Sequence, residues 1–227
     1  VIAPTQKVKD SLLSYGVTRP ITIIPTGIDT SRFKKENFTA EGRKELRKEY
    51  GFTDETKVLL VVGRIAQEKN IDAVIKAMPV VFERNENARL IIVGEGPYKE
   101  TLENLASSLG VADKITFAGP KPWADMPNYY NMADIYLSAS SSETQGLTFV
   151  EAMAGGLPVV AKKDPCLDGL IENGISGITF EDESQMGDVI SSVIENNEKL
   201  AEISKNAEIS AENFSSKTFG KNVAALY

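Results

Sequence analysis

The chain has 227 residues, of which 42% are hydrophobic and 25% are charged, with a formal net charge of −7 and no histidine. This length and composition predict a globular protein with a substantial core, and the acidic balance argues against a nucleic-acid binder or a polybasic membrane patch. Without histidine the chain has no Ser-His-Asp triad, no Cys-His pair and no zinc site with histidine ligands.

Residues 1–5 resemble a strand whose beginning is missing, and they include neither an initial Met nor a charged leader. We therefore expect a fragment of a longer protein. Residues 5–15 follow as a capped helix closed by Gly16. Residues 21–25 read as a strand that runs into Thr26-Gly27-Ile28-Asp29. These pieces precede the main sheet and resemble connector elements.

From residue 57 onward, short apolar runs alternate with amphipathic stretches. Near-continuous Val, Ile and Leu in such runs is typical of parallel strands that are covered on both faces. The predicted strands are 58–62, 90–93, 115–118, 135–137, 157–161 and 178–180. This α/β alternation predicts a doubly wound parallel sheet in the order 3-2-1-4-5-6.

The helices between these strands have recognisable ends. Pro79 lies inside the first of them and should kink or divide it. After residue 184 the chain reads as polar helices that wrap the outside of a domain. Asn70 is predicted to cap the first helix, with Asp72 in its first turn. The next helix is predicted to begin at Pro97 and to end at Gly110. A later helix is predicted to begin near Gly146 and to end at Gly155-Gly156.

Ligands of a doubly wound sheet bind beyond the carboxyl ends of the strands, here between the first and fourth strands. Gly63, Arg64 and Lys69 follow the first strand. Glycine allows close backbone approach, and the two cations suit a diphosphate, although two solvated cations in a loop are the alternative. The stretch contains neither a P-loop nor a G-x-G-x-x-G motif, and Gly94-Glu95-Gly96 is only G-x-G because position 99 is Lys.

Two glutamates, Glu143 and Glu151, lie eight positions apart after the fourth strand. Glu151 is the one charged residue on an otherwise largely apolar helix, where a carboxylate is costly unless it is hydrogen-bonded. Ligand hydroxyls could supply those bonds; an internal Arg or backbone donors are the alternative. Glu143 alone could be an exposed turn residue, but opposite Arg64 it becomes a site candidate.

Three segments together resemble the large family of retaining, nucleotide-sugar-dependent glycosyltransferases of group 1 (family 4), which have the GT-B fold. The segments are VGRIAQEKN at 62–70, IVGEGP at 92–97, and Glu143-x7-Glu151 followed by Ala-Met-Ala and Gly-x-Pro. In that family two Rossmann-like halves face each other, and the C-terminal half binds the sugar donor. The resemblance implies that residues 1–28 are the end of the N-terminal half and the connector, 29–210 the Rossmann-like donor-binding domain, and 211–227 a trailing helix.

The resemblance also implies roles for individual residues. The diphosphate would be held by Arg64 and Lys69, the donor sugar by Glu143 and the ribose by Glu151, with the base near Lys121. No metal and no other cofactor is implied, because a helix N-terminus, Arg and Lys supply the positive charge. The implied catalytic residues are Arg64, Lys69 and Glu143, and the implied donor-binding residues are Gly63, Gly94, Glu95, Lys121, Thr144, Gln145, Gly146, Leu147, Thr148 and Glu151.

One departure narrows the resemblance. Many family members read Glu-Gly-Phe-Gly-Leu where this chain reads ETQGL at 143–147, and this form, with KKDPCLD at 162–168, looks most like glucosyltransferases that build glycolipids on diacylglycerol in Gram-positive bacteria. The implied activity is transfer of a hexose, glucose from UDP-glucose, to a lipid or glycan acceptor, with GDP and ADP donors left open. The implied partner is a missing N-terminal half, without which the fragment is inactive, and the implied location is cytoplasmic or peripheral at the inner face of the membrane.

Two other readings remain open. A nucleotide-sugar epimerase uses the same double architecture, whereas a non-catalytic nucleotide-binding module of the phospho-receiver type would need Asp where Gly63 and Arg64 stand.

Several further residues favour structural roles. They are Cys166, which lacks a His partner and cannot form an internal disulfide; Trp123, Tyr129 and Tyr130, which fit packing around a short helix; and Lys162 and Lys163, which either approach a ligand or are solvated. No apolar run approaches the ~20 residues that span a bilayer, so we expect no membrane crossing.

Overall fold

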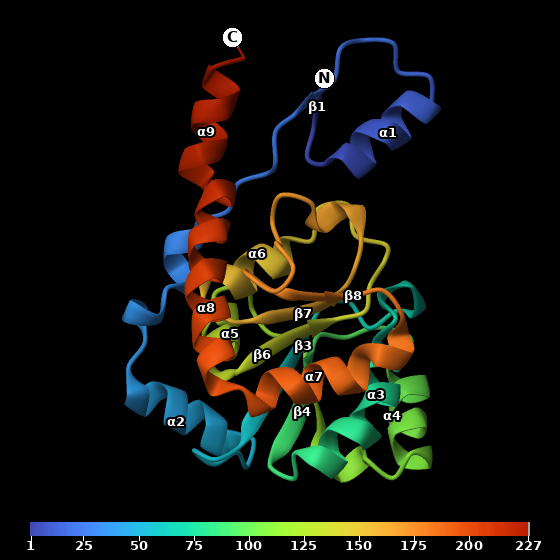
Figure 1. The fold of residues 1–227 in the computed structure, drawn as a ribbon, viewed down its shortest axis with the longest axis vertical. Helices are drawn as coiled ribbons and strands as arrows, with labels where there is room; N and C mark the ends of the chain where they lie inside the picture. The colour runs from blue at the N-terminus through green and yellow to red at the C-terminus, as the bar shows by residue number, and fades with distance from the viewer. Residues whose placement is uncertain (227) are drawn as a thin grey trace.

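The computed structural model describes residues 1–226, in which six strands form one parallel sheet in the order β5-β4-β3-β6-β7-β8 (Figure 1). Every neighbouring pair in this sheet is parallel. The predicted α/β class and the order 3-2-1-4-5-6 are confirmed. The strands are β3 (Lys57–Val62), β4 (Ala88–Val93), β5 (Ile115–Gly119), β6 (Ile135–Ser138), β7 (Val159–Lys162) and β8 (Ile178–Phe180).

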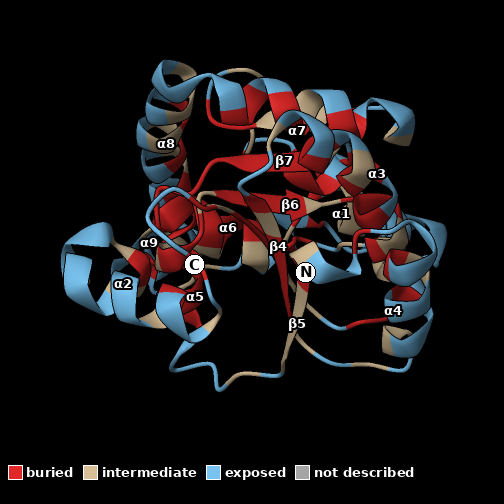
Figure 2. Ribbon diagram, turned by 90° about the horizontal axis from the view of Figure 1, so that it is seen from below, coloured by how far each residue is buried: buried red, intermediate tan, exposed pale blue. Residues whose placement is uncertain are grey.

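Helices cover both faces of the sheet (Figure 2). Alternate residues of each central strand enter two separate cores. Leu59 and Val61 of β3 face one core, whereas Val58 and Leu60 face the other. Burial on both faces explains why these strands are continuous apolar runs. The first core is covered by α3 (Ile71–Arg84), α4 (Lys99–Ser108) and α7 (Met186–Glu195), and the second by α5 (Met126–Met132), α6 (Leu147–Ala154) and α8 (Asn197–Ala211).

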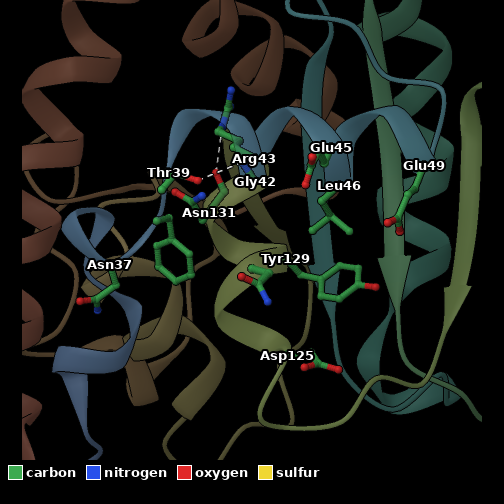
Figure 3. A pocket seen from close by; sticks show the side chains of 12 residues that line it. Asn37, Thr39, Gly42, Arg43, Glu45, Leu46, Glu49, Asp125, Tyr129 and Asn131 are labelled. Atoms are coloured by element: carbon green, nitrogen blue, oxygen red, sulfur yellow. Dashed lines mark hydrogen bonds between the residues drawn. The ribbon is translucent and has the colours of Figure 1, made fainter.

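The helix α2 (Ala40–Glu49) packs against α5 on the outside of the second core. Arg47 is buried, donates hydrogen bonds to the carbonyls of Met132 and Thr56, and forms an ion pair with Asp134. A groove of about 440 Å³ runs between the two helices (Figure 3). None of the predicted site residues lines this groove.

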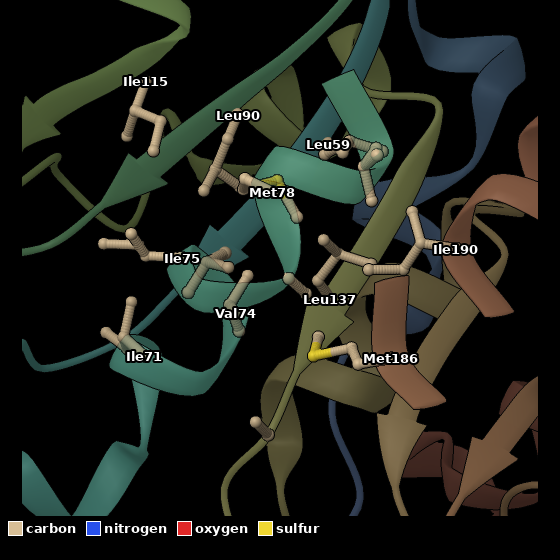
Figure 4. Packing of buried hydrophobic residues seen from close by; sticks show 14 of the residues in the cluster. Leu59, Ile71, Val74, Ile75, Met78, Leu90, Ile115, Leu137, Met186 and Ile190 are labelled. Atoms are coloured by element: carbon tan, nitrogen blue, oxygen red, sulfur yellow. The ribbon is translucent and has the colours of Figure 1, made fainter. Parts of the chain in front are cut away.

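Two predictions about the helices are corrected in part, because Pro79 does not divide its helix and the region after residue 184 is not all on the outside. The helix α3 is continuous through Pro79, because one lost backbone hydrogen bond is outweighed by the burial of Val74 and Met78 in the first core (Figure 4). The region after residue 184 does not only wrap the outside. Met186 and Ile190 of α7 are fully buried in the same core (Figure 4), so α7 forms part of it.

Residues 1–28, here called the N-terminal segment, lie with α9 (Ser216–Ala224) at one end of the molecule (Figure 1). The segment contains α1 (Gln6–Ser14), which is capped by Thr5, and a two-stranded parallel pair, β1 (Ile2–Ala3) and β2 (Thr22–Ile23). The predicted helix and strand are therefore present.

The end of the N-terminal segment crosses the junction between α8 and α9. Ile28 pairs with Ser215, and a Cβ added to Gly27 would lie 2.6 Å from the Ser215 carbonyl oxygen and 2.6 Å from the Phe219 Cβ. Glycine at position 27 is what permits this close crossing. The short 3-10 turns of the fold are η1 (Thr30–Phe33), η2 (Lys35–Asn37), η3 (Gln67–Lys69), η4 (Ala112–Lys114), η5 (Pro165–Leu167), η6 (Glu183–Gln185) and η7 (Glu212–Phe214).

Across residues 1–226, no helix has both the length and the apolar character needed to cross a bilayer.

Candidate functional site

Glycines at the carboxyl ends of three adjacent strands form the floor of a cleft of about 870 Å³. The Gly63 amide donates to the Val93 carbonyl at 3.0 Å, and the Gly94 amide donates to the Gly119 carbonyl at 3.0 Å. A Cβ on Gly94 would collide with the Gly63 carbonyl, and one on Gly96 would collide with the Ile65 carbonyl. The glycines of the G-x-G pattern, Gly94 and Gly96, therefore allow the backbone after β4 to pack closely against the backbone after β3.

Charged side chains surround this floor. Arg64, Glu95 and Lys121, all predicted site residues, line the cleft together with Lys99. Sequence reasoning missed Lys99, although the signal was present, because Lys99 is the residue that replaces the last glycine of a G-x-G-x-x-G motif. Three cations and one carboxylate at the rim make this cleft suitable for an anionic ligand.

All three cations already have partners, and Lys99 pairs with Glu103 on α4 at 3.4 Å. Arg64 pairs with Glu68 one helical turn away, and the Arg64 side chain is 67% exposed. The Lys121 ammonium lies 5.5 Å from the ring centre of Tyr129, and hydrogen bonds to the hydroxyls of Tyr50 and Tyr129 raise the Lys121 pKa. Lys121 therefore stays charged in the neutral range.

The three predicted catalytic residues meet where β3 and β6 end. Arg64, Lys69 and Glu143 line one small cavity, and the Lys69 Nζ donates to the Glu143 Oε1 at 2.6 Å. The ion pair is largely shielded from water, with the Glu143 side chain 18% exposed. The predicted pairing of Arg64 and Glu143 across the switch point thus becomes a cluster of three, with Lys69 in direct contact with the carboxylate.

Asn70 occupies the N-cap position of α3, as predicted, but its side chain joins the loop after β3 to the loop after β6 instead of capping the helix. Its backbone is left-handed, with φ of 53°, and its side chain makes no cap hydrogen bond. The Asn70 amide instead donates to the Ala139 carbonyl at 3.2 Å and to the Glu183 carboxylate at 2.7 Å.

The prediction that Pro97 begins a helix was wrong. The helix α4 begins two residues later, at Lys99. The backbone amide of Tyr98 donates to the Ile65 carbonyl at 3.1 Å. Tyr98 is thereby bound to the loop after β3, and the helix begins after it. Gly110, in contrast, has φ of 69° and follows α4 as the predicted left-handed stop.

Glu151 is bound by a tyrosine hydroxyl rather than by an arginine or by backbone donors. The Tyr130 hydroxyl donates to the Glu151 Oε2 at 2.6 Å, and Tyr130 is only 1% exposed. Burial raises the pKa of Glu151, while hydrogen bonds from Tyr130 and Trp123 and the charge of Arg32 oppose this rise. The Arg32 guanidinium lies 3.6 Å from the centre of the Trp123 ring, so the two residues that act on the Glu151 carboxylate are also in contact with each other.

Tyr130 and Trp123 therefore do more than pack. The interpretation of Tyr130 as a packing residue was incomplete, because a buried tyrosine hydroxyl needs a hydrogen-bond partner and finds it here in Glu151. That requirement was the available signal, but the sequence did not identify the partner.

The remaining predicted donor-binding residues begin α6. Gly146 has φ of 69° and precedes the helix, and Leu147 is partly exposed. The Thr148 hydroxyl accepts from the Tyr136 hydroxyl at 2.8 Å. The side chains of Thr148 and Gln145 therefore bind within the protein, and Gln145 reaches the backbone of Thr26 in the N-terminal segment.

Other singled-out side chains are engaged in structure. Lys162 and Lys163 form ion pairs with Glu183 and Glu181 at 2.6 and 2.7 Å, respectively. Cys166 is buried, and burial raises the pKa of its thiol far above the ordinary value, which makes it a poor nucleophile.

Comparisons with known proteins match the chain to one family. The family described as "Glycosyl transferases group 1" matches residues 42–210. The chain is 35% identical over 226 residues to an alpha-monoglucosyldiacylglycerol synthase of Acholeplasma laidlawii and 38% identical over 232 residues to one of Streptococcus pneumoniae. These matches cover 100% of this chain but 57% and 51% of the two relatives, so the chain spans about half of their length.

Solved structures show the same fold. The structure of HepE from Anabaena in complex with UDP and glucose matches all of this chain and 62% of that protein, with a TM-score of 0.89 at 24% identity. WaaG, a glycosyltransferase involved in lipopolysaccharide biosynthesis, matches 97% of the chain with a TM-score of 0.83. At these identities the likeness establishes the fold, which is that of GT-B glycosyltransferases.

Proposed function

Because the chain belongs to the group 1 glycosyl transferases, we propose that it is the nucleotide-sugar-binding part of a retaining hexosyltransferase that uses UDP-glucose. The observation that carries this proposal is the meeting of Arg64, Lys69 and Glu143 at the ends of β3 and β6, beside the cleft above β3, β4 and β5. Such a cluster at a topological switch point suits a ligand with a diphosphate and a polar sugar.

The chemistry follows from the charges. When the bond between sugar and diphosphate breaks, negative charge develops on the leaving nucleoside diphosphate, and Arg64, Lys69 and Lys99 stabilise it. Glu143 accepts hydrogen bonds from sugar hydroxyls while Lys69 holds its carboxylate in place. Glu151 accepts from the ribose hydroxyls. We further propose that these cations replace the metal ion that other transferases use, and that the acceptor attacks from the face that the leaving group vacates.

The identity of donor and acceptor rests on the relatives. Two relatives at 35% and 38% identity are named alpha-monoglucosyldiacylglycerol synthases, which favours glucose as the sugar and diacylglycerol as the acceptor. A Mycobacterium tuberculosis relative, 31% identical over 178 residues, is named a GDP-mannose-dependent mannosyltransferase. GDP-mannose is therefore the alternative donor to test against UDP-glucose.

We propose that the acceptor site belongs to an N-terminal half. Residues 1–28 would then be the end of that half and the connector, residues 29–210 the donor-binding domain, and residues 211–227 the trailing helix. Support comes from the relatives, which are about twice as long as the matched region. The full-length protein would work in the cytoplasm, at the inner face of the cell membrane where a diacylglycerol acceptor is available.

Calorimetry on the 227-residue chain with UDP, UDP-glucose, GDP-mannose and ADP-glucose tests the donor. We expect binding of the uridine ligands, and a loss of about tenfold or more in affinity for Arg64→Ala and Glu151→Ala. Arg84→Ala is the matched control, because Arg84 is a half-exposed arginine on α3 that pairs with Asp188 at 2.8 Å, outside the cleft. Equal affinity of Arg64→Ala and Arg84→Ala would overturn the site, and glucosyl transfer to diacylglycerol by this chain alone would overturn the separate acceptor half.

A further inference from the structure

Side-chain contacts join the N-terminal segment to residues 139–146, here called the Glu143 loop. The Thr5 hydroxyl donates to the Thr144 carbonyl at 2.7 Å. The Lys7 ammonium donates to the Ser141 carbonyl at 2.9 Å. The side-chain amide of Gln145 accepts from the Thr26 amide at 3.0 Å and donates to the Thr26 carbonyl at 2.9 Å. These contacts lie on both sides of Glu143 in the chain.

The bonds made by Thr5 and Gln145 are part-buried, whereas the bond from Lys7 to the Ser141 carbonyl is exposed. Thr5 and Gln145 are 9% and 5% exposed, respectively. A hydrogen bond in such surroundings is stronger than one in water, and a carbonyl left without a partner there is costly. The loop therefore favours the position in which Thr5 satisfies the Thr144 carbonyl and the Gln145 amide bonds the Thr26 backbone.

Lys7 is itself held in place by a second partner. Its ammonium lies 2.8 and 3.0 Å from the two carboxylate oxygens of Asp164, which is 7% exposed. Burial alone would raise the pKa of Asp164, but hydrogen bonds from Lys7 and from the Cys166 amide outweigh it and lower the pKa. Asp164 is therefore ionised at neutral pH and fixes Lys7 against the Ser141 carbonyl.

The other side of the loop is held by the sheet domain. The Ser142 hydroxyl donates to the Glu68 carbonyl at 3.1 Å, and Lys69 pairs with Glu143 at 2.6 Å. The Glu143 loop thus lies between η3, which carries Lys69, and the N-terminal segment. A shift of the segment would pull the loop at Ser141, Thr144 and Gln145 while η3 stays in place, and would separate Glu143 from Lys69.

We propose that the N-terminal segment is a positioning element for Glu143 and that the positioning residues are Thr5 and Lys7 of the segment and Gln145 of the loop. The segment holds the loop where the carboxylate meets Lys69, and thereby sets recognition of the donor's sugar. Recognition of the nucleotide does not depend on it, because the cleft above β3, β4 and β5 is lined by none of these residues. The ligand named here rests on the proposed function; the mechanical link between segment and loop does not.

Two variants test the link. Thr5→Val removes the hydroxyl that bonds Thr144, and Gln145→Met removes the amide that bonds Thr26. We expect backbone amides of residues 141–146 to exchange hydrogen about fivefold faster in Thr5→Val, which loses one hydrogen bond to the loop, and faster by at least that factor in Gln145→Met, which loses two. Affinity for UDP-glucose should fall by a similar factor, while affinity for UDP changes less than twofold.

Matched controls separate positioning from folding. Thr5 also caps α1 by accepting from the Val8 amide at 3.3 Å, so Thr39→Val, which removes the equivalent cap of α2 at 3.1 Å, reports the effect of cap loss alone. Thr39→Val should leave exchange at 141–146 and both affinities unchanged. Thr5→Ser keeps the hydroxyl and should restore wild-type values. Gln145→Met leaves the cap of α1 untouched, so it tests the link even if Thr5→Val unfolds α1.

The outcomes are distinct. Unchanged exchange at 141–146 in both Thr5→Val and Gln145→Met would overturn the mechanical link, as would equal effects of Thr5→Val and Thr39→Val. An equal loss of affinity for UDP and UDP-glucose would overturn the assignment to sugar recognition. If the wild-type chain binds neither ligand, the proposed function fails, whereas faster exchange in the two variants would still support the link.

Discussion

Replacing Tyr130 with Phe tests whether Glu151 is a charged, oriented acceptor. The change removes one hydroxyl and keeps the buried ring. The lost hydrogen bond, 2.6 Å from hydroxyl to carboxylate oxygen, has a charged acceptor and should cost about 1.5–3 kcal/mol of unfolding free energy. Tyr136→Phe is the matched control. The Tyr136 hydroxyl donates to a neutral partner, the Thr148 hydroxyl, at 2.8 Å, and Thr148 lies on α6, the helix that also carries Glu151. Its loss should cost about 0.5–1.5 kcal/mol.

The pH dependence separates the two variants. Burial already raises the pKa of Glu151, and removal of the Tyr130 hydroxyl should raise it further. A carboxyl whose pKa is higher in the folded protein favours the fold while protonated, and this contribution is lost as pH rises through the folded-state pKa. The cost of Tyr130→Phe should therefore be largest at neutral pH and should shrink below the ordinary glutamate pKa. The cost of Tyr136→Phe should stay constant.

Urea unfolding of both variants at neutral and acidic pH, with calorimetry of UDP binding at neutral pH, provides the assay. We expect Tyr130→Phe to weaken UDP about tenfold, because the carboxylate loses the contact that aims it, and Tyr136→Phe to change affinity less than threefold. If the two variants lose the same stability at both pH values and bind UDP alike, the Tyr130 hydroxyl does not orient a charged Glu151 and the reasoning fails.

Three further predictions follow from the structure. Gly27→Ala should lower the unfolding free energy by about 2–3 kcal/mol, because its Cβ would collide with the backbone of Ser215; a wild-type urea midpoint would contradict this. Glu143→Gln should weaken UDP-glucose about tenfold and UDP less than twofold by calorimetry, and equal losses would place Glu143 on the diphosphate instead. EDTA should leave UDP affinity unchanged, whereas a fall in affinity that Mg²⁺ restores would show that the cations do not replace a metal.

Most of the fold could be predicted because its signals are local. Strands buried on both faces are continuous apolar runs, and Val58 to Val62 is such a run whatever lies around it. The order of the strands followed from the rules that govern α/β alternation. The burial of α7 was missed, because Met186 and Ile190 are spaced among Gly, Asp and Ser residues, which made the stretch read as polar.

The candidate site was predicted residue by residue but not as a set of contacts. Arg64, Lys69 and Glu143 follow strands that meet at the switch point, so topology alone brings them together. The partners of Glu151 and Gln145 depend on contacts between segments 21 and 119 residues apart in the chain, which no local pattern encodes. Asn70 was assigned from its residue type, but its left-handed backbone points the amide to another loop.

The floor of the cleft and its rim differ in how freely they tolerate change. At Gly94 and Gly96 backbone packs on backbone, so every larger residue is excluded on steric grounds whichever nucleotide is bound. At the rim, Arg64 is two-thirds exposed and Lys99 and Lys121 project from later elements, so they accept substitution without repacking a core. In the proposed site Arg64 and Lys99 hold the diphosphate and only Lys121 lies near the base, so randomising position 121 over an unchanged floor is a practical way to test base preference without disturbing the packed glycines.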